Sequence, residues 1–429
     1  MNESKSKLSE LWTTEDWWAV WLGAIIFILT PWIRMIPKVK TWETNPLVSV
    51  PAGLLMPLLF LLIGIAVLLV PALRCMRAGA GKFLVAFPVL FILSVVSYIV
   101  ASQSVLKAYG LGYAFWALIL GLFISNAFGL PEWLKPAVKT ELYIKIGLVL
   151  LGGEILFAKM LSLGAQGLLV AWVVTPIVII FMYFFGTRVL KGLSKTLVIV
   201  IAAATSVCGV SAAIATAGAC RAKKEELTLA VGMTLIFTVL MMVFMPIGIK
   251  WVGMDYIVGG AWMGGTIDST GAVVAAGDML GKDAMDVAAV VKMIQNVLIG
   301  LVAFVVAVLW VTRIDRDRNA PKPTPMEIWY RFPKFIIGFV AASVGFSFIL
   351  APLLGDKIVD AMLEISGGFQ DYFFCLAFVS IGLESNFREL AKQMVGGRPM
   401  VVYIVGQSFN LILTLAMAYI AFGGILFPR

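Results

Sequence analysis

Residues 256–280 read YIVGGAWMGGTIDSTGAVVAAGDML, and residues 196–220 read TLVIVIAAATSVCGVSAAIATAGAC. Both stretches are apolar at each end and small, polar and glycine-rich in the middle. Irregular backbone of this kind is tolerated at membrane depth only where protein or a water-filled cavity surrounds it. Paired interruptions in apolar segments point to the binding site of a secondary transporter. The two stretches therefore predict a pair of interrupted helices, broken or re-entrant, within a membrane protein.

The composition of the whole chain also indicates many membrane spans. Hydrophobic residues make up 61% of the 429 residues, charged residues only 13%, and the mean hydropathy is +1.00. Hydropathy gives about 13 segments of roughly 18 or more apolar residues. We expect an all-α polytopic helix bundle of about 11–13 segments, with a cytoplasmic N-terminal segment at 1–16 and a single transmembrane domain at 17–429.

The charges of the loops predict the orientation. The stretch from Arg313 to Lys334 holds six basic and three acidic residues and is rich in proline. Basic loops stay on the cytoplasmic side, so we expect an extended cytoplasmic linker at about 313–334 and an N-terminus inside. The acidic stretch from Gly355 to Asp371 is expected to be an external loop. Loop charge mildly favours re-entrant hairpins at 197–220 and 256–280, with two crossing broken helices as the alternative.

Several classes of protein are excluded by residue content. The chain has no His, which rules out a Ser-His-Asp triad and a His-ligated metal. Its four cysteines form no C-x-x-C pair, so neither a disulfide framework nor a thiolate zinc site is expected. The net charge of +9 comes from short loops without interleaved aromatic residues, so nucleic-acid binding is rejected. We predict no enzymatic activity, no metal and no cofactor, with H+ or Na+ as the coupling ion.

Ionisable residues inside apolar segments need a reason, because a charge at the bilayer centre costs about 2.5–3.5 kcal/mol. Asp268 is the deepest and is interpreted as the residue that senses a coupling proton or cation; the alternative is a structural partner for a lysine. Lys292 is expected to attract an anionic substrate or to pair with Asp268. Glu154 is a further candidate for coupling. Lys145 lies near a segment end and is expected to reach the interface by snorkelling.

Small and hydroxyl-bearing residues at the two polar centres are the candidate substrate ligands. They are Thr205, Ser206, Cys208, Gly209, Ser211, Thr266, Ser269 and Thr270. Helix N-termini at such interruptions offer unpaired N–H groups and a partial positive charge, which suits an anion. The competing interpretation is tight helix packing, since Gly260 and Gly264 also fit a G-x-x-x-G pattern.

The motifs TSVCGVSAAIATAG and GGTIDSTGAVVAAG, the downstream Val290-Val291-Lys292, and KIGLVLLGGEI at 145–155 resemble the YeiH-type family, whose members carry the label of sulfate exporters. The resemblance implies an inner-membrane protein of about ten or more helices, related to inverted-repeat secondary carriers. Many members have Ile-His-Asp-Thr with a Gln two positions after the Thr. This chain has Ile267-Asp268-Ser269-Thr270 and Ala272, so a different anion or a different coupling is expected.

The sequence therefore predicts a secondary active transporter that exports a small anion such as sulfate, sulfite or an organosulfonate. Binding is expected between the two interrupted helices, followed by alternating access. The expected partners are the small anionic substrate and the lipid bilayer. A second copy of the chain is a further candidate partner, because homodimers are the commonest oligomers. Two alternatives stay open. One is an ion- or proton-coupled cation carrier that uses Asp268, Glu154 and Glu384, and the other is a non-transporting membrane receptor.

Overall fold

The structure is a computed structural model that describes residues 7–108, 112–155, 157–314, 324–389 and 397–427. Helices make up the regular structure of these ranges, and the β pairing found there is one isolated bridge between Trp42 and Gln103. The chain divides into two compact units. Unit 1 comprises Met1–Met160 and Lys334–Asn386, and unit 2 comprises Leu161–Pro333 and Phe387–Arg429.

The helices of unit 1 are α1 (Lys7–Thr13), α2 (Glu15–Leu29), α3 (Ala52–Cys75), α4 (Ala80–Ala101), α5 (Ser104–Ala108), α6 (Tyr113–Phe128), α7 (Thr140–Glu154), α17 (Phe335–Val344), α18 (Ala351–Leu354) and α19 (Asp356–Glu384). The helices of unit 2 are α9 (Val174–Phe184), α10 (Lys195–Ser206), α11 (Val210–Cys220), α12 (Lys224–Trp251), α13 (Tyr256–Thr266), α14 (Thr270–Asp278), α15 (Lys282–Leu309), α16 (Met326–Arg331) and α21 (Arg398–Phe422). The division between the units falls inside α8 (Phe157–Leu168).

Shorter turns extend several of these helices. Turns of π-helix follow α8, α9, α15 and α17 at Leu169–Val173, Phe185–Val189, Trp310–Ile314 and Gly345–Leu350. Turns of 3-10 helix lie at Thr30–Trp32, Pro46–Ser49 and Lys135–Ala137.

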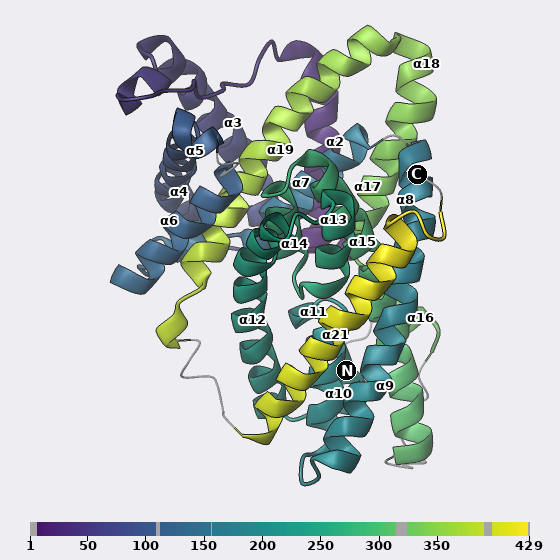
Figure 1. Cartoon of the computed structure of the whole chain (residues 1–429). Helices are drawn as coiled ribbons and strands as arrows, with labels where there is room; N and C mark the ends of the chain where they lie inside the picture. The colour runs from purple at the N-terminus through teal and green to yellow at the C-terminus, as the bar shows by residue number, and fades with distance from the viewer. Residues whose placement is uncertain (1–6, 109–111, 156, 315–323, 390–396, 428–429) are drawn as a thin grey trace. The chain divides into compact units, whose positions relative to one another are not determined.

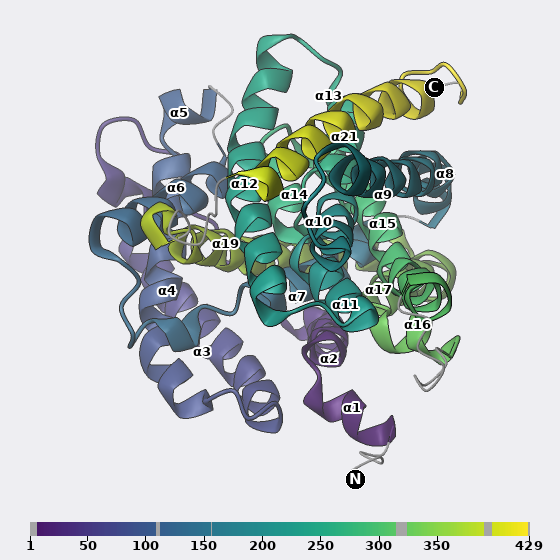
Figure 2. The ribbon, with the colours of Figure 1, turned by 90° about the horizontal axis from the view of Figure 1, so that it is seen from below.

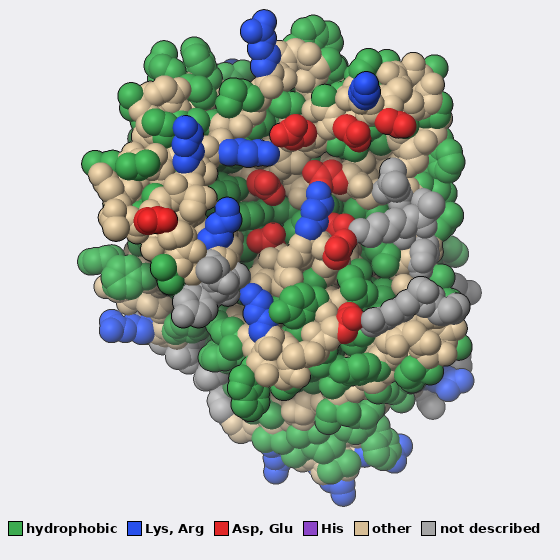
Figure 3. Space-filling view, turned by 45° about the horizontal axis from the view of Figure 1, so that its top comes forward, with side chains coloured by type: hydrophobic (Ala, Val, Ile, Leu, Met, Phe, Trp, Pro, Cys, Tyr) green, Lys and Arg blue, Asp and Glu red, His purple; other side chains and the backbone are tan. Residues whose placement is uncertain are grey.

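Seven helical stretches in the described part of the chain are long and apolar enough to cross a membrane. They are Ala52–Cys75, Ala80–Ala101, Leu163–Val189, Lys224–Trp251, Lys282–Ile314, Phe335–Leu354 and Arg398–Phe422. Large apolar side chains on them, among them Phe60, Ile180 and Phe244, are exposed. Hydrophobic side chains also cover much of the face in Figure 3, where the acidic side chains lie mainly in the upper half and the basic ones extend to the edges of the view. The chain is therefore an all-helical, multi-pass membrane protein.

The prediction of an external loop from Gly355 to Asp371 is wrong, because α19 begins at Asp356 and runs without a break to Glu384. Asp356, Asp360 and Glu364 are spaced four residues apart, so they share one exposed face of this helix. Val359 and Met362 are buried on the other face. Hydropathy stops at the acidic residues, whereas the helical period continues through them.

The predicted linker at 313–334 is partly helical. Residues 315–323 lie outside the described residues, but Met326–Arg331 form α16. This helix packs closely on α15, because a Cβ on Gly300 would come within 2.7 Å of the carbonyl oxygen of Ile328. Arg331 also donates to the carbonyl oxygen of Ala215 in α11.

Glycines set the close helix crossings within unit 1. A Cβ on Gly121 of α6 would lie 2.4 Å from the carbonyl oxygen of Val379, and one on Gly382 of α19 would lie 2.5 Å from that of Leu118. These two helices therefore meet backbone to backbone.

Glycines also fix the packing of unit 2. Gly260 and Gly264 lie against α15, where added Cβ atoms would come within 2.5 Å and 2.6 Å of the carbonyl oxygens of Ala284 and Ala288. The packing role considered for this G-x-x-x-G pair is therefore correct. In both ribbon views α14 lies between α12 and α15 (Figures 1 and 2).

Candidate functional site

Helical geometry is lost for three residues in each of the two polar stretches. The chain leaves α10 after Ser206, passes through Val207 to Gly209, and re-enters a helix at Val210. It leaves α13 after Thr266 and re-enters a helix at Thr270, with Ile267 and Ser269 in extended conformations. We call these segments, 207–209 and 267–269, the first and the second break.

The two breaks are in direct contact. Gly209 has φ of +59° and ψ of −112°, a conformation that L side chains rarely adopt. A Cβ at this position would lie 2.9 Å from the carbonyl oxygen of Asp268 and 2.7 Å from Cγ2 of Thr234. Glycine is therefore needed twice at position 209, for its backbone conformation and for the space that the second break occupies.

The helices that lead into the breaks have carbonyl ends capped by side-chain amides. Gln295 Nε2 donates to the carbonyl oxygens of Ser206 (2.9 Å) and Gly265 (3.1 Å), so one amide joins the ends of α10 and α13. Asn410 Nδ2 donates to the carbonyl oxygen of Thr205 (3.2 Å). Gln407 Nε2 donates to that of Thr266 (3.2 Å). These amides satisfy carbonyl groups that a helix end otherwise leaves without partners.

The helices that follow the breaks, α11 and α14, differ at their N-termini from the helices that precede them, α10 and α13. Ser194 and Asp255 cap α10 and α13 by accepting hydrogen bonds from main-chain N–H groups. Gly209 and Ser269, at the starts of α11 and α14, make no side-chain cap. Two positive helix ends without side-chain caps therefore begin at the breaks, a combination suited to a negatively charged group.

Asp268 is buried at the second break with a tyrosine as its partner. Its side chain is 1% exposed, and Oδ2 accepts a hydrogen bond from the Tyr403 hydroxyl of α21. Its other oxygen, Oδ1, has no hydrogen-bond partner in the described part of the chain. The ring of Tyr403 packs on Phe237 of α12 at 4.6 Å between centroids. The expected lysine partner of Asp268 is thus replaced by a phenol.

Lys292 of α15 is buried beside the first break. Its ammonium donates to the carbonyl oxygen of Val207 (2.5 Å) and to Gln295 Oε1 (2.8 Å). No ion pair with Asp268 is found in the described residues. An ammonium has three N–H donors, so two are used here and one is left over.

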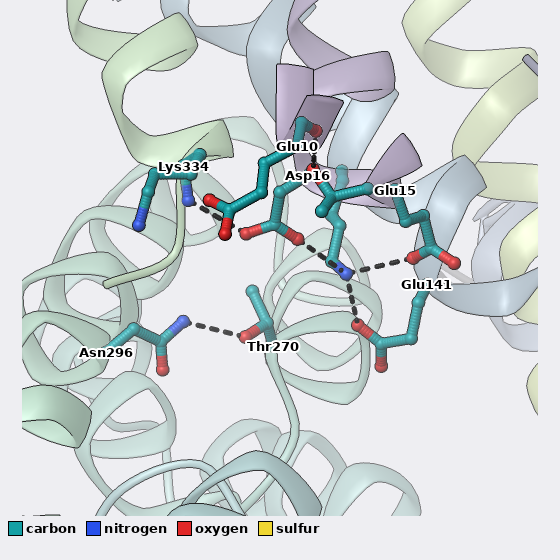
Figure 4. A network of polar contacts seen from close by, with 9 residues as sticks. Glu10, Glu15, Asp16, Glu141, Thr270, Asn296 and Lys334 are labelled. Atoms are coloured by element: carbon teal, nitrogen blue, oxygen red, sulfur yellow. Dashed lines mark hydrogen bonds and ion pairs between the residues drawn. The ribbon is translucent and has the colours of Figure 1, made fainter. Parts of the chain in front are cut away.

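The hydroxyl candidates fall into two groups. The Thr205 and Ser206 hydroxyls donate to carbonyl oxygens one turn back in α10, at 2.9 Å and 2.5 Å. Thr270 Oγ1 accepts from Asn296 Nδ2 at 3.0 Å (Figure 4), which leaves the Thr270 hydrogen free to donate elsewhere. Thr266 Oγ1 is buried without a hydrogen-bond partner in the described ranges.

The remaining candidates differ in exposure. Cys208 is buried, Ser269 is half-buried and Ser211 is exposed. Glu154 belongs to unit 1, at the end of α7, where Oε1 would lie 2.3 Å from a Cβ on Gly367 of α19.

Lys145, which is expected to reach the interface by snorkelling, pairs with three acidic side chains. Its ammonium lies 2.9 Å from Glu15, 3.0 Å from Asp16 and 3.7 Å from Glu141, so it holds the start of α2 against α7 (Figure 4). Its side chain is only 16% exposed. The carboxylates of α2 thus pair with this lysine. Hydropathy alone suggested only that the lysine would extend to the interface.

Sequence reasoning missed the contribution of α21. Tyr403, Gln407, Asn410 and Thr414 are spaced four, three and four residues apart, so they form one polar stripe on an apolar helix. This spacing could have been recognised in the sequence as the polar face of a helix. Searched over the described residues, no group of three or more Cys, Asp or Glu could hold a metal ion.

The apolar helices and the buried polar residues of unit 2 define a multi-pass helical membrane protein with a polar interior. Residues 86–403 match the family described as conserved hypothetical protein 698, and the chain belongs to that family. The resemblance to the YeiH-type family is thereby confirmed.

Relatives with similar sequences are described as UPF0324 membrane proteins. One from Rhodopirellula baltica is 54% identical over 92% of this chain and 73% of its own length. One from Nitratidesulfovibrio vulgaris is 51% identical over 91% of this chain and 67% of its own length. One from Nitrosomonas europaea is 31% identical over 97% of both chains. No solved structure matches the chain.

Proposed function

We propose that this protein is a secondary active transporter that exports a small anion, with sulfate, sulfite or an organosulfonate as the leading substrates. The observation that carries the proposal is the contact between the two breaks, where Gly209 lies against Asp268. Two helices without side-chain caps start there, and Lys292 is buried beside them. Interrupted helices that bring such ends together are the recurring form of a transporter binding site.

The anion binds, in this proposal, where the starts of α11 and α14 supply N–H groups. Lys292 contributes its third N–H and its charge, and the Thr270 hydroxyl donates a further hydrogen bond. Each charge-assisted hydrogen bond contributes about 1.5–3 kcal/mol. The exposed Ser211 and the half-buried Ser269 fit an entrance to this site. Thr205 and Ser206 then support it through the geometry of α10, because their hydroxyls already donate within that helix.

Transport follows by alternating access in the inner membrane, with the N-terminus in the cytoplasm. The two compact units are the two bodies that such a mechanism needs. Asp268 binds the coupling ion, and the two breaks belong to an inverted repeat. Re-entrant hairpins and crossing broken helices both allow this arrangement.

Flux in proteoliposomes tests the proposal. Labelled sulfate is loaded and competed with sulfite, thiosulfate, taurine, isethionate and sulfoacetate, with and without gradients of pH and Na+. We expect saturable flux that one of these anions inhibits and one gradient drives. Lys292→Met should raise the half-saturating anion concentration of this flux by about 10- to 100-fold, whereas Lys224→Met, at the exposed start of α12, should leave it unchanged.

Two other results identify the alternatives. Flux that depends on the cation alone, whatever the anion, indicates a cation carrier that uses Asp268. Anion binding without flux, by protein that is folded and inserted, indicates a receptor.

A further inference from the structure

Several side-chain oxygens in the described part of unit 2 are buried without a hydrogen-bond partner, and four of them belong to residues around the end of α13. These four are Thr238 Oγ1, Thr266 Oγ1, Asp268 Oδ1 and Gln407 Oε1, on side chains that are 5%, 1%, 1% and 3% exposed. Leaving a buried polar atom unpaired costs about 1–3 kcal/mol. Four such atoms in one unit of a folded protein therefore need an explanation.

Hydrogen bonds bring Gln407 and Asp268 to the same end of α13. Gln407 donates to the carbonyl oxygen of Thr266, and Tyr403, one turn earlier on α21, donates to Asp268. One face of α21 thus runs along residues 266–268. The amide orientation of Gln407 follows from its neighbours, because its nitrogen contacts a carbonyl oxygen and the Met241 sulfur, which are both acceptors. Its oxygen is therefore the unpaired atom.

Thr238 reaches the same place from α12. Residues 234, 238 and 241 share one face of that helix, since they are four and three residues apart. Thr234 contacts the position of Gly209, which lies against Asp268. Met241 Sδ lies 2.8 Å from Gln407 Nε2. Thr238 therefore faces the stretch between Asp268 and Gln407.

We propose that these four oxygens form a binding site for a hard monovalent cation, with Na+ as the ion that fits. Hard cations take oxygen ligands, and a site with one carboxylate and three neutral oxygens matches a single positive charge. The carbonyl end of α13 adds the negative end of a helix dipole. Such half-helix ends coordinate Na+ in secondary transporters. A proton on Asp268 Oδ1 pairs that oxygen with at most one of the other three and leaves at least two unpaired, so it explains less.

Lys292 lies near enough to interact electrostatically with Asp268 but forms no ion pair with it in the described residues. Its ammonium donates to Val207 and Gln295 instead. Asp268 Oδ1 therefore has no direct cationic partner in the described residues and can take a bound cation. If the proposed anion transport holds, on which this step rests, an anion at Lys292 lowers the repulsion between the ammonium and the bound cation. Each ligand then raises the affinity for the other, because coupling between two sites is reciprocal.

Equilibrium binding of labelled 22Na+ to the purified full chain in detergent, without any anion, tests the site. We expect saturable binding that Na+ displaces and that choline does not. Thr238→Val and Gln407→Leu should each weaken it by at least about tenfold, the loss expected for one ligand of a charged group. Asp268→Asn should abolish it. Thr228→Val is the matched control, because its hydroxyl bonds within α12 to Lys224 and lies outside the cluster.

The outcomes separate this site from the proposed transport. Absence of saturable 22Na+ binding by folded wild-type protein overturns the cation site, even if pH-driven anion flux is found. Binding that Asp268→Asn abolishes but Thr238→Val and Gln407→Leu leave unchanged also overturns the four-oxygen site. Binding that follows the expected pattern in a protein without anion flux supports the cation site and refutes the anion transporter. Monodisperse gel filtration of each variant shows that a loss is not a failure to fold.

Discussion

Replacement of Gln295 by Met is expected to loosen both breaks at once. Methionine has nearly the same length and shape, so the change removes the amide and keeps the packing. The wild-type amide donates to the carbonyl oxygens of Ser206 and Gly265 and accepts from Lys292. In the variant, two carbonyl groups and one N–H of a buried ammonium lose their partner.

The size of the effect follows from these three hydrogen bonds. Hydrogen bonds between membrane helices contribute about 0.6–1.7 kcal/mol each, which gives a loss of about 2–5 kcal/mol. If unit 2 unfolds cooperatively with the per-residue entropy of globular proteins, this loss lowers its melting temperature by about 5–10 °C.

Thermal unfolding in detergent, followed by tryptophan fluorescence, measures the shift. Gln295→Glu is the informative partner variant, because a carboxylate still accepts from Lys292 but cannot donate to the two carbonyl groups. We expect Gln295→Glu to be destabilised as well. We also expect its anion flux to fall by more than its lower stability accounts for. A Gln295→Met protein with wild-type melting temperature and flux refutes the claim that this amide holds the two breaks together.

Three further substitutions test other parts of the structure. Gly209→Ala places a Cβ within 2.9 Å of the Asp268 carbonyl oxygen at a φ of +59°, and should cost about 2–4 kcal/mol, measured as a lower melting temperature; wild-type stability would show that the two breaks do not touch. Lys292→Met should raise the half-saturating concentration of the transported anion by about 10- to 100-fold, the effect of one charge-assisted hydrogen bond, and an unchanged value argues against an anion contact at this lysine. Lys145→Met leaves Glu15, Asp16 and Glu141 to repel one another at a cost of about 1–2 kcal/mol, so limited proteolysis near the N-terminus should be faster, and about 1 M NaCl should partly restore the wild-type rate; equal rates in the variant and the wild type would mean that these ion pairs do not hold α2 in place.

The sequence predicted the helical membrane class and singled out the two polar stretches, Asp268 within the second of them and Lys292 in the apolar segment that follows it. Hydropathy and composition are local properties, so they are readable one segment at a time. The partners of these residues were not predictable in the same way. Tyr403 follows Asp268 by 135 positions. Nothing in the local pattern says which apolar helix packs beside the second break.

Two further misses have the same physical origin. The start of α19 was taken for a loop because its charges lower the average hydropathy, although their four-residue spacing preserves a buried face. Lys145 was assigned to the interface because its acidic partners Glu15 and Asp16 lie 130 and 129 positions earlier in the chain. In both places the prediction considered only the free-energy cost of burying the charge itself. That cost depends on the residues that lie opposite the charge in the folded protein.

The shared amide of Gln295 has a mechanical consequence. It is carried by α15, a helix that continues through a π-helical turn to Ile314 and packs against α16. Since one NH2 group holds the ends of both α10 and α13, a displacement of α15 along its axis pulls on both at once. A shift of one residue along the axis is about 1.5 Å, which stretches a 2.9 Å hydrogen bond to between about 3.3 Å and 4.4 Å, depending on the angle between the shift and the bond. The position of α15 along its axis and the geometry of both breaks are therefore coupled through one side chain.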